Sequence, residues 1–286
     1  MAQATPAINR QTPQAKRSGI GIELVRSLAA EGQRVFSLVE ARKAAVRVGM
    51  RQSYLTEALH HLERTGWIVR IKRGLYAVSS SIPGVSPVHE FEIAMAMAKP
   101  AAISHWSALH HHGLTEQAPR TVFVLTPGVR NVSHLNRSQD RRRHAGQNAP
   151  LRPFHFVSIQ RKWFFGVENV WVGEARITMT DPERTLLDGL SNPKLCGDFA
   201  EVLHAFERRG HELDVKRIIR YALKLDAAMA KRLGWVLEHH GVPAEKLRPL
   251  LEAPIRGWRK LDASSSSHGS YIRRWMIQEN LPGSFR

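Results

Sequence analysis

The first 80 residues carry a pattern of apolar and polar positions that predicts three helices followed by a β-hairpin. Apolar side chains recur every three or four positions, as on the buried face of a helix, in residues 20–31, 38–48 and 52–64. Two shorter strand-like runs follow, WIVRI (67–71) and LYAV (75–78), separated by the turn Lys72-Arg73-Gly74. Helix, helix, short turn, helix and hairpin, in this order, predict a winged helix-turn-helix.

Start and stop signals at the ends of these helices support the pattern. Ser37 is the expected N-cap of the second helix, and Glu40 stands at the third helical position, where it completes a capping box. Gly49 permits a tight turn before the third helix, and Gly66 ends that helix. The caps, the turns and the periodicity therefore favour the same arrangement.

A second, larger set of elements follows a stretch rich in Ser, Pro and Gly, SSSIPGVSP (79–87). Helical spacing recurs in 89–98, 104–113 (with Ser104 as the expected cap), 182–190, 199–210, 214–225 and 227–241. Strand-like runs lie at 121–127, 154–159, 169–173 and 176–180, and a final strand is expected in 271–280. These strands predict a mixed sheet, and the helices after Asp181 predict a bundle.

The predicted fold class is α+β, with an N-terminal winged helix-turn-helix followed by a larger mixed α/β C-terminal domain made of a small sheet and a helical bundle. The expected organisation is a flexible basic tail (1–19), the winged helix-turn-helix (20–79), a linker (80–87) and the C-terminal domain (88–286), which contains a long basic loop at 128–153.

Composition narrows the class of protein. The chain has 286 residues and a single cysteine, Cys196, which excludes an internal disulfide and a multi-cysteine metal site. No apolar run approaches the roughly 18 residues of a membrane span, and the first 18 residues lack the apolar core of a signal peptide. We therefore expect a cytoplasmic protein that does not enter a membrane.

The net charge of +17 is concentrated in two blocks. Residues 1–82 hold 13 basic and 5 acidic residues, and residues 120–165 hold 9 and 1, so each block has a net charge of +8. The segment between them, 83–119, has a net charge of −2, and residues 166–286 have +3. Two basic blocks predict contact with a polyanion in two places, and nucleic acid is the leading candidate.

Four segments together resemble the AbiEi-type antitoxins, which are bacterial transcriptional regulators of type IV toxin–antitoxin systems in phage defence. They are RTGWIVRIKRGLYAV (64–78), AAISHWSALHHHGLTEQAPRTVFVLTP (101–127), TDPERTLLDGL (180–190) and RRWMIQEN (273–280). The resemblance implies an autorepressor whose winged helix binds inverted repeats in its own promoter. It also implies a C-terminal domain that counters a nucleotidyltransferase-like toxin without forming a stable complex with it.

Residues around the third helix are the expected contacts with double-stranded DNA. Arg51 and Gln52 suit bidentate pairing with guanine and adenine, while Ser53, Tyr54 and Ser37 suit phosphate oxygens. Thr56 and His60 share the exposed face of the helix, and Arg70, Lys72 and Arg73 belong to the wing. The alternative is a solvated helix surface that binds nothing.

The second basic block centres on a loop. Its arginines are Arg130, Arg137, Arg141, Arg142 and Arg143, joined by Arg152, Arg161 and Lys162. They predict a second polyanion-binding patch or, alternatively, a charged loop without a partner.

The sequence offers little for catalysis. The histidine pairs and the triplet at 110–112 lack metal-ligand spacing, so we expect no metal, no cofactor and no catalytic residue. A metal-dependent nuclease carrying a winged-helix targeting domain would use Asp181, Glu183 and the Asp214-Val215-Lys216 triplet. These residues read better as helix starts, with Asp181 as N-cap and Pro182 at the first helical position.

The function expected from the sequence is that of a non-enzymatic DNA-binding autorepressor and antitoxin. The alternatives are the nuclease and a protein or RNA interaction module that uses the 120–165 block. By the resemblance alone, a toxin-neutralising surface is expected on exposed basic residues of the last helices: Lys216, Arg217, Arg220, Lys224, Lys231 and Arg232.

Overall fold

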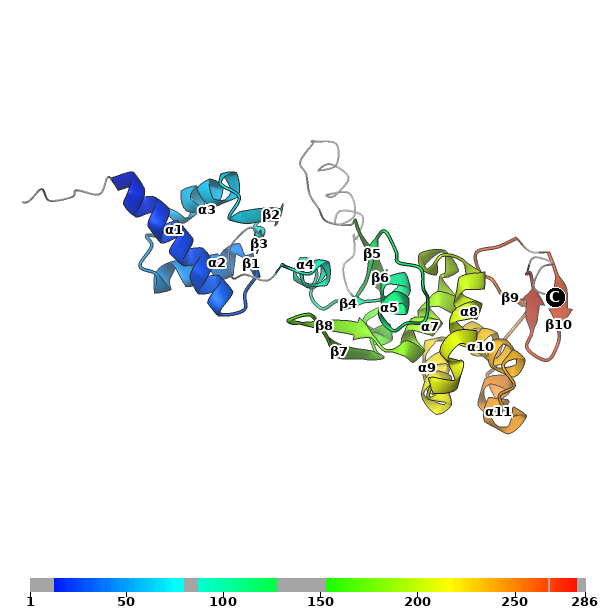
Figure 1. Cartoon of the computed structure of the whole chain (residues 1–286). Helices are drawn as coiled ribbons and strands as arrows, with labels where there is room; N and C mark the ends of the chain where they lie inside the picture. The colour runs from blue at the N-terminus through cyan, green and yellow to red at the C-terminus, as the bar shows by residue number, and fades with distance from the viewer. Residues whose placement is uncertain (1–12, 80–86, 128–152, 267, 282–286) are drawn as a thin grey trace, which may run out of the picture. The chain divides into compact units, whose positions relative to one another are not determined.

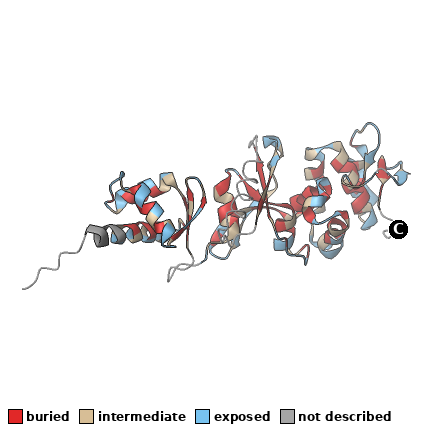
Figure 2. Ribbon diagram, turned by 90° about the horizontal axis from the view of Figure 1, so that it is seen from above, coloured by how far each residue is buried: buried red, intermediate tan, exposed pale blue. Residues whose placement is uncertain are grey.

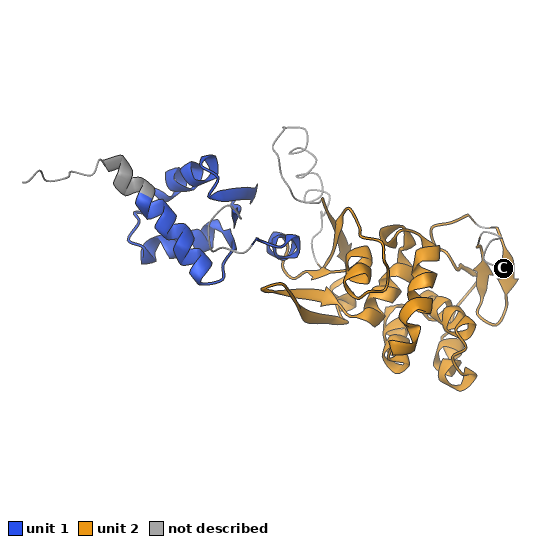
Figure 3. Ribbon diagram, in the orientation of Figure 1, with its two compact units in different colours: residues 1–97 blue, residues 98–286 orange. Residues whose placement is uncertain are grey.

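The computed structural model describes residues 13–79, 87–127, 153–266 and 268–281. The chain divides into two compact units, residues 1–97 and residues 98–286 (Figure 3). The predicted linker (80–87) lies outside the described residues except for Pro87, and the division falls after Met97.

The first unit contains four helices and three strands within its described residues (Figure 1). In chain order they are α1 (Pro13–Ala30), β1 (Val35–Ser37), α2 (Leu38–Arg47), α3 (Leu55–Arg64), β2 (Ile68–Lys72), β3 (Leu75–Val78) and α4 (Glu90–Met97). The strands form an antiparallel sheet in the order β1-β3-β2. The three helices and the hairpin predicted for residues 20–78 are therefore present.

The core of this unit forms where α1 and α3 pack with α2. Leu24 and Leu28 of α1 are fully buried with Leu55, Leu59 and Leu62 of α3, as the helical spacing predicts. On α2 the buried positions are all alanines, so the helix backbone lies close to its neighbours. Outside this core, α3 exposes polar side chains such as Thr56 and His60, whereas α2 also exposes Val39 and Val46.

Two details of the prediction for this unit are wrong. Residues 13–19, assigned to the flexible tail, are helical, and Pro13 is well suited to the first position of a helix. Residues 52–54, assigned to the third helix, form a turn that precedes α3. Strand β1 was not predicted, because three residues show no period and their pairing partner lies 40 residues away in β3.

Helix α4 is grouped with the first unit rather than with the C-terminal domain. The Lys72 side chain donates a hydrogen bond of 2.8 Å to the carbonyl of Met97, at the end of α4. Arg34 forms an ion pair of 2.9 Å with Glu92, and both side chains are largely buried. Contacts of this kind account for the division after Met97.

A five-stranded mixed sheet occupies the first part of the second unit. Its strands are β4 (Ala102–Ile103), β5 (Val122–Pro127), β6 (Phe154–Ile159), β7 (Val167–Val172) and β8 (Ala175–Thr180), in the order β6-β5-β4-β8-β7. β5 and β6 are parallel, as are β4 and β8, and the other two pairs are antiparallel. The mixed sheet expected from the sequence is present, with the short central strand β4 in addition.

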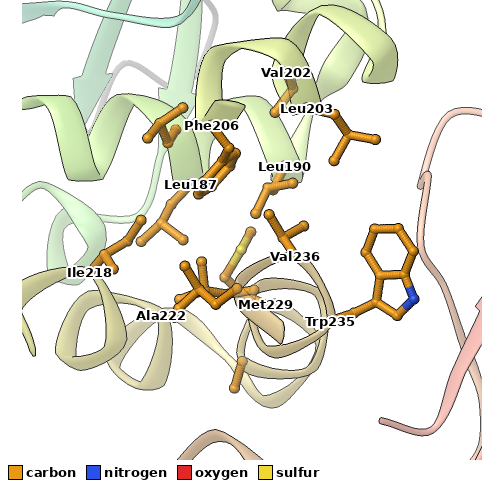
Figure 4. Close-up of a cluster of buried hydrophobic side chains, with 14 of the residues drawn as sticks. Leu187, Leu190, Val202, Leu203, Phe206, Ile218, Ala222, Met229, Trp235 and Val236 are labelled. Carbon is orange, nitrogen blue, oxygen red and sulfur yellow. The ribbon is translucent and has the colours of Figure 1, made fainter. Parts of the chain in front are cut away.

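Helices fill the rest of this unit. They are α5 (His105–His111), α7 (Pro182–Ser191), α8 (Phe199–Arg209), α9 (Val215–Leu225), α10 (Ala227–His239) and α11 (Ala244–Glu252), with short 3-10 turns η1 (Arg161–Trp163), η2 (Pro193–Cys196) and η3 (Gly210–Glu212). Leu187, Phe206, Ile218 and Val236 meet in one buried cluster from α7, α8, α9 and α10 (Figure 4). Helices α8 and α9 have one buried and one exposed face, whereas α7 and α10 are buried along most of their length (Figure 2). Helix α11 was not predicted.

A small three-stranded sheet closes the second unit. Its strands are β9 (Arg259–Lys260), β10 (Ser270–Ile272) and β11 (Ile277–Glu279), in the order β10-β11-β9. The single strand predicted over 271–280 is wrong, because β10 and β11 form a hairpin. Trp275 in the turn packs directly on Gly234 of α10, where even a Cβ atom would lie 2.0 Å from the indole ring. That glycine fixes how closely the small sheet lies against the bundle.

Candidate nucleic-acid interface

The turn between α2 and α3 presents polar residues to solvent. Gly49 adopts a φ of +70°, and the Met50 N–H bonds to the Ala45 carbonyl at 2.8 Å, so the chain reverses with Met50 buried. Arg51, immediately after it, is exposed. Arg51 also lines an open depression of about 470 Å³ between Ile20 of α1, this turn and the first turn of α3.

The exposed face of α3 is as predicted. Leu55, Leu59 and Leu62 are buried, which leaves Thr56 and His60 exposed on the opposite side. Glu57 is also exposed there, as the single carboxylate in the first turn of α3. This face is therefore polar, and its charge comes mainly from the turn before it.

Three predicted contact residues are placed differently from the prediction. Gln52 and Ser53 are exposed but lie in the turn, not in the first turn of α3, and Tyr54 is half-buried at the N-cap position. The Gln52 side-chain amide donates a hydrogen bond of 3.1 Å to the carbonyl of Arg42 in α2. The prediction that these three residues lie within the third helix is thus wrong, because the turn that begins at Gly49 continues to Tyr54.

The hairpin contains two exposed arginines and one engaged lysine. Arg70 in β2 and Arg73 in the turn are exposed. Lys72 is half-buried, bonds to the Met97 carbonyl, and burial lowers the pKa of its ammonium group. Lys72 therefore faces α4, and the prediction that it lies at the wing tip with Arg73 is corrected.

Ser37 forms the predicted capping box. Its hydroxyl accepts a bond of 3.3 Å from the Glu40 N–H, and its own N–H donates to the Glu40 carboxylate at 2.5 Å. Ser37 is half-buried, so its main contribution is to begin α2. A phosphate contact by this residue stays a prediction.

Most of the second predicted patch lies outside the described residues. Arg130, Arg137, Arg141, Arg142, Arg143 and Arg152 lie outside the described residues. Arg161 and Lys162 of η1 are described, and both are exposed.

The carboxylates considered for a nuclease are engaged as helix caps. Asp181 accepts from the Arg184 N–H at 2.7 Å and from the Tyr221 hydroxyl at 3.0 Å. Glu183 accepts from the Asp214 N–H at 2.9 Å, and Asp214 in turn caps α9. In the parts of the chain that the structure describes, no three His, Cys, Asp or Glu residues are grouped so as to hold a metal ion.

A buried polar network that the sequence did not predict lies beneath this capping region. Arg184 is 2% exposed and forms a 2.9 Å ion pair with Asp188 one turn later. It also donates to the Trp163 carbonyl at 2.7 Å and lies over the Phe165 ring. The signal available in the sequence was the spacing of Arg184 and Asp188, which stand four residues apart among leucines and can therefore pair on one side of a helix.

His105 belongs to the same buried region. It has a left-handed φ of +49°, and its Nδ1 bonds to the Ser104 hydroxyl at 2.8 Å. Ser104 occupies the N-cap position of α5, as predicted, but its side chain makes no capping bond there. Burial is the main cause of the lowered pKa of His105; Arg184 and His155 lower it further, while Asp188 raises it.

The basic residues of the last helices divide into two groups. Lys216, Arg220 and Lys224 are exposed along α9, and Arg217 beside them pairs with Glu183 and Asp214. Lys231 is buried and donates to the Leu250 and Leu251 carbonyls, and Arg232 donates to the Lys260 carbonyl. The prediction that these last two lie on an exposed basic face is wrong, because both serve to hold neighbouring backbone.

Comparison with known families defines the class of the N-terminal unit. Residues 23–79 match the family described as transcriptional regulator, AbiEi antitoxin. The match extends from α1 through α2, the turn and α3 to the end of the hairpin. The resemblance inferred from the sequence is confirmed for this segment.

The fold of nearly the whole chain is similar to one solved structure. The crystal structure of the RV2827C protein from Mycobacterium tuberculosis superposes with a TM-score of 0.64, covers 91% of this chain and 90% of its own, and is 13% identical in sequence. At this identity the similarity concerns the fold alone. No curated protein matches the chain in sequence.

Among the described helices, none is both long and apolar enough to cross a membrane.

Proposed function

We propose that the chain is a DNA-binding transcriptional regulator in which residues 20–79 form a winged helix-turn-helix. The family match at residues 23–79 is the observation that carries this proposal. In support, α2 and α3 are joined by a tight turn, and a hairpin follows α3 in the same antiparallel sheet as β1. In this arrangement α3 is the recognition helix and the β2–β3 turn is the tip of the wing.

The exposed side chains divide the contacts between base edges and phosphates. Arg51, in the turn that enters α3, is assigned to a guanine edge, and Thr56 and His60 follow it along the exposed face. Arg70 and Arg73 are assigned to the phosphate backbone beside the wing. Gln52 reads an adenine only when its amide leaves the Arg42 carbonyl, so its contribution is smaller than that of Arg51.

The antitoxin role rests on the resemblance. By that resemblance, the regulator represses its own promoter at inverted repeats, and the second unit counters a nucleotidyltransferase-like toxin without a stable complex. The exposed part of the α9 basic face, Lys216, Arg220 and Lys224, is the surface we assign to this second role.

Footprinting on the DNA upstream of the protein's own reading frame tests DNA binding. The wild-type chain should protect two related half-sites, and Arg51→Ala should lose protection at the same protein concentration. Arg248→Ala, on the exposed surface of α11, removes one positive charge from the second unit and should protect as the wild type does. Equal protection by Arg51→Ala and the wild type would contradict the assignment of the recognition surface.

Growth during co-expression tests the antitoxin role. A nucleotidyltransferase-like reading frame next to the gene is induced alone, with the wild-type chain, and with a Lys216→Ala/Arg220→Ala/Lys224→Ala variant. The wild-type chain should restore growth and the triple variant should not, while both keep the footprint. Failure of the wild-type chain to restore growth would overturn the antitoxin role and leave the DNA-binding proposal standing.

A further inference from the structure

Two large aromatic side chains lie exposed together on the small C-terminal sheet. Trp258 is 41% exposed and Tyr271 is 60% exposed, and their rings meet edge to face with centroids 4.9 Å apart. Trp258 immediately precedes β9 and Tyr271 lies in β10, the two outer strands of the sheet. Large aromatic groups on a surface are informative because burying them would stabilise the fold.

The fold holds these rings outward by using the other face of the sheet for packing. Ile277 and Trp275 are fully buried against the helical bundle, and Ile272 packs against the same cluster. Because successive side chains of a strand point to opposite faces, Tyr271 is directed away from that cluster. The small sheet lies at the end of the unit beside α10, so the aromatic pair is not covered by the bundle (Figure 1).

The surroundings of the pair are positively charged. Arg256, Arg259 and Arg273 are exposed, and within the described part of the chain none of them pairs with a carboxylate. Residues 253–281 contain two acidic residues, Asp262 and Glu279. Asp262 is buried and bonded to Ser264, so Glu279 is the one carboxylate of this segment left to offset the arginines. Arg274 nearby is already paired with Glu238 at 2.8 Å.

We infer that this surface, Trp258 and Tyr271 with Arg256, Arg259 and Arg273, binds single-stranded nucleic acid. Aromatic rings stack on unpaired bases, while arginines neutralise the phosphates between them. The edge-to-face contact leaves no room between the two rings, so a base stacks on an outward ring face. A second copy of this chain would bring the same positive segment against itself, which disfavours self-association here.

Fluorescence anisotropy of the full chain with labelled oligo(dT) and oligo(U) tests the inference. At a physiological salt concentration of about 0.15 M, which weakens contacts that are purely electrostatic, Trp258→Ala and Tyr271→Ala should each lower the affinity about 5- to 150-fold, the range that base stacking gives. Trp258→Phe and Tyr271→Phe keep a ring and should retain most of the affinity. Trp171→Ala is the matched control, because Trp171 in β7 is 69% exposed and lies outside the C-terminal sheet.

Three outcomes would overturn the inference. Unchanged affinity in both alanine variants would show that the rings do not stack on bases, and an equal loss in Trp171→Ala would show a nonspecific aromatic effect. Binding of polyglutamate that depends on Trp258, without binding of either oligonucleotide, would assign the surface to an acidic protein instead. Footprinting with the same variants separates this surface from the proposed DNA-binding unit, which should protect its sites unchanged.

Discussion

Two groups of charged residues, one in each unit, are placed in opposite ways. In the first unit, arginines at 51, 70 and 73 extend into solvent from a turn and a hairpin, around a core of leucines and alanines. In the second unit, Asp181, Arg184 and Asp188 are buried along α7, where Asp181 accepts from the Arg184 N–H and the Arg184 side chain bonds to Asp188 and to the Trp163 carbonyl. The same residue types are therefore exposed at the proposed DNA-binding surface in one region and hold the fold together in the other.

The contrast between exposed and bonded charges is also visible between two residues adjacent in the chain. Lys72, the last residue of β2, and Arg73, in the turn that follows, are adjacent basic residues, yet Lys72 bonds to the carbonyl at the end of α4 while Arg73 is exposed. A positive charge near a wing is thus not in itself a DNA contact. What separates these two residues is that the protein itself supplies an acceptor for Lys72, while Arg73 is left for the proposed DNA contact.

The largest expected effect comes from breaking the buried ion pair. Arg184→Met should lower the free energy of unfolding by about 3–5 kcal/mol, because Asp188 is left as a buried charge without its partner. Urea unfolding measures this change. Arg248→Met removes one partner of an exposed pair with Glu252 and should cost less than about 0.5 kcal/mol. Equal stability of the two variants would contradict the structural role of the network.

Acidification should destabilise the protein through three histidines, of which His105 is fully buried. Burial lowers the pKa of His105, and also those of His155 and His240, below the ordinary value of 6.5. The unfolded chain then binds more protons between pH 6.5 and the lowered pKa, so stability falls as the pH drops through this window. The pKa values of Glu212 and Asp214 are also lowered, chiefly by bonds to Arg209 and to the Arg217 N–H, so the stability these carboxylates contribute is lost as the pH falls below their ordinary values of 4.5 and 3.8.

His105→Asn isolates the contribution of one histidine. Asparagine tolerates the left-handed backbone at this position, so the variant should fold. The slope of the unfolding free energy against pH should decrease by at most about 1.4 kcal/mol per pH unit in the acidic window. The same change at His110, exposed on the same helix, is the control. An unchanged slope in His105→Asn would contradict burial as the cause.

A smaller effect is expected at the cap of α7. Asp181→Ala should lower the free energy of unfolding by about 1–2 kcal/mol, because the Arg184 N–H loses its acceptor. Asp181→Asn keeps a capping oxygen and should recover most of this loss. In the presence of Mg²⁺, the wild type and both variants should all leave plasmid DNA uncleaved. Cleavage by the wild type that Asp181→Asn abolishes would instead support the nuclease alternative.

The elements with several turns or a clear alternation could be predicted from the sequence. α2, α3, the β2–β3 hairpin and α7 to α10 each have enough residues for a period and carry caps such as Ser37 and Asp181. β1 and β4 could not be predicted, because strands of two or three residues form only through pairing with distant segments. The helix at 13–19 was missed because its polar residues resemble those of a tail.

The sequence predicted the exposure of several candidate site residues but not the hydrogen bonds that engage others. Exposure of Arg51, Thr56 and His60 follows from the buried leucines of α3. The bonds from Gln52 to the Arg42 carbonyl and from Lys72 to the Met97 carbonyl depend on backbone positions that the spacing of residues does not reveal. Trp258 and Tyr271 are 13 residues apart in the chain, so their contact emerges only in the folded sheet.

The salt dependence of binding to the protein's own upstream DNA tests the central claim most directly. The logarithm of affinity should fall linearly with the logarithm of salt concentration, and Arg73→Met should reduce the slope by about one unit, because it removes one phosphate contact. Lys72→Met should leave the slope unchanged, since that charge faces α4. A flat response in the wild type, or equal slopes for Arg73→Met and the wild type, would contradict the account.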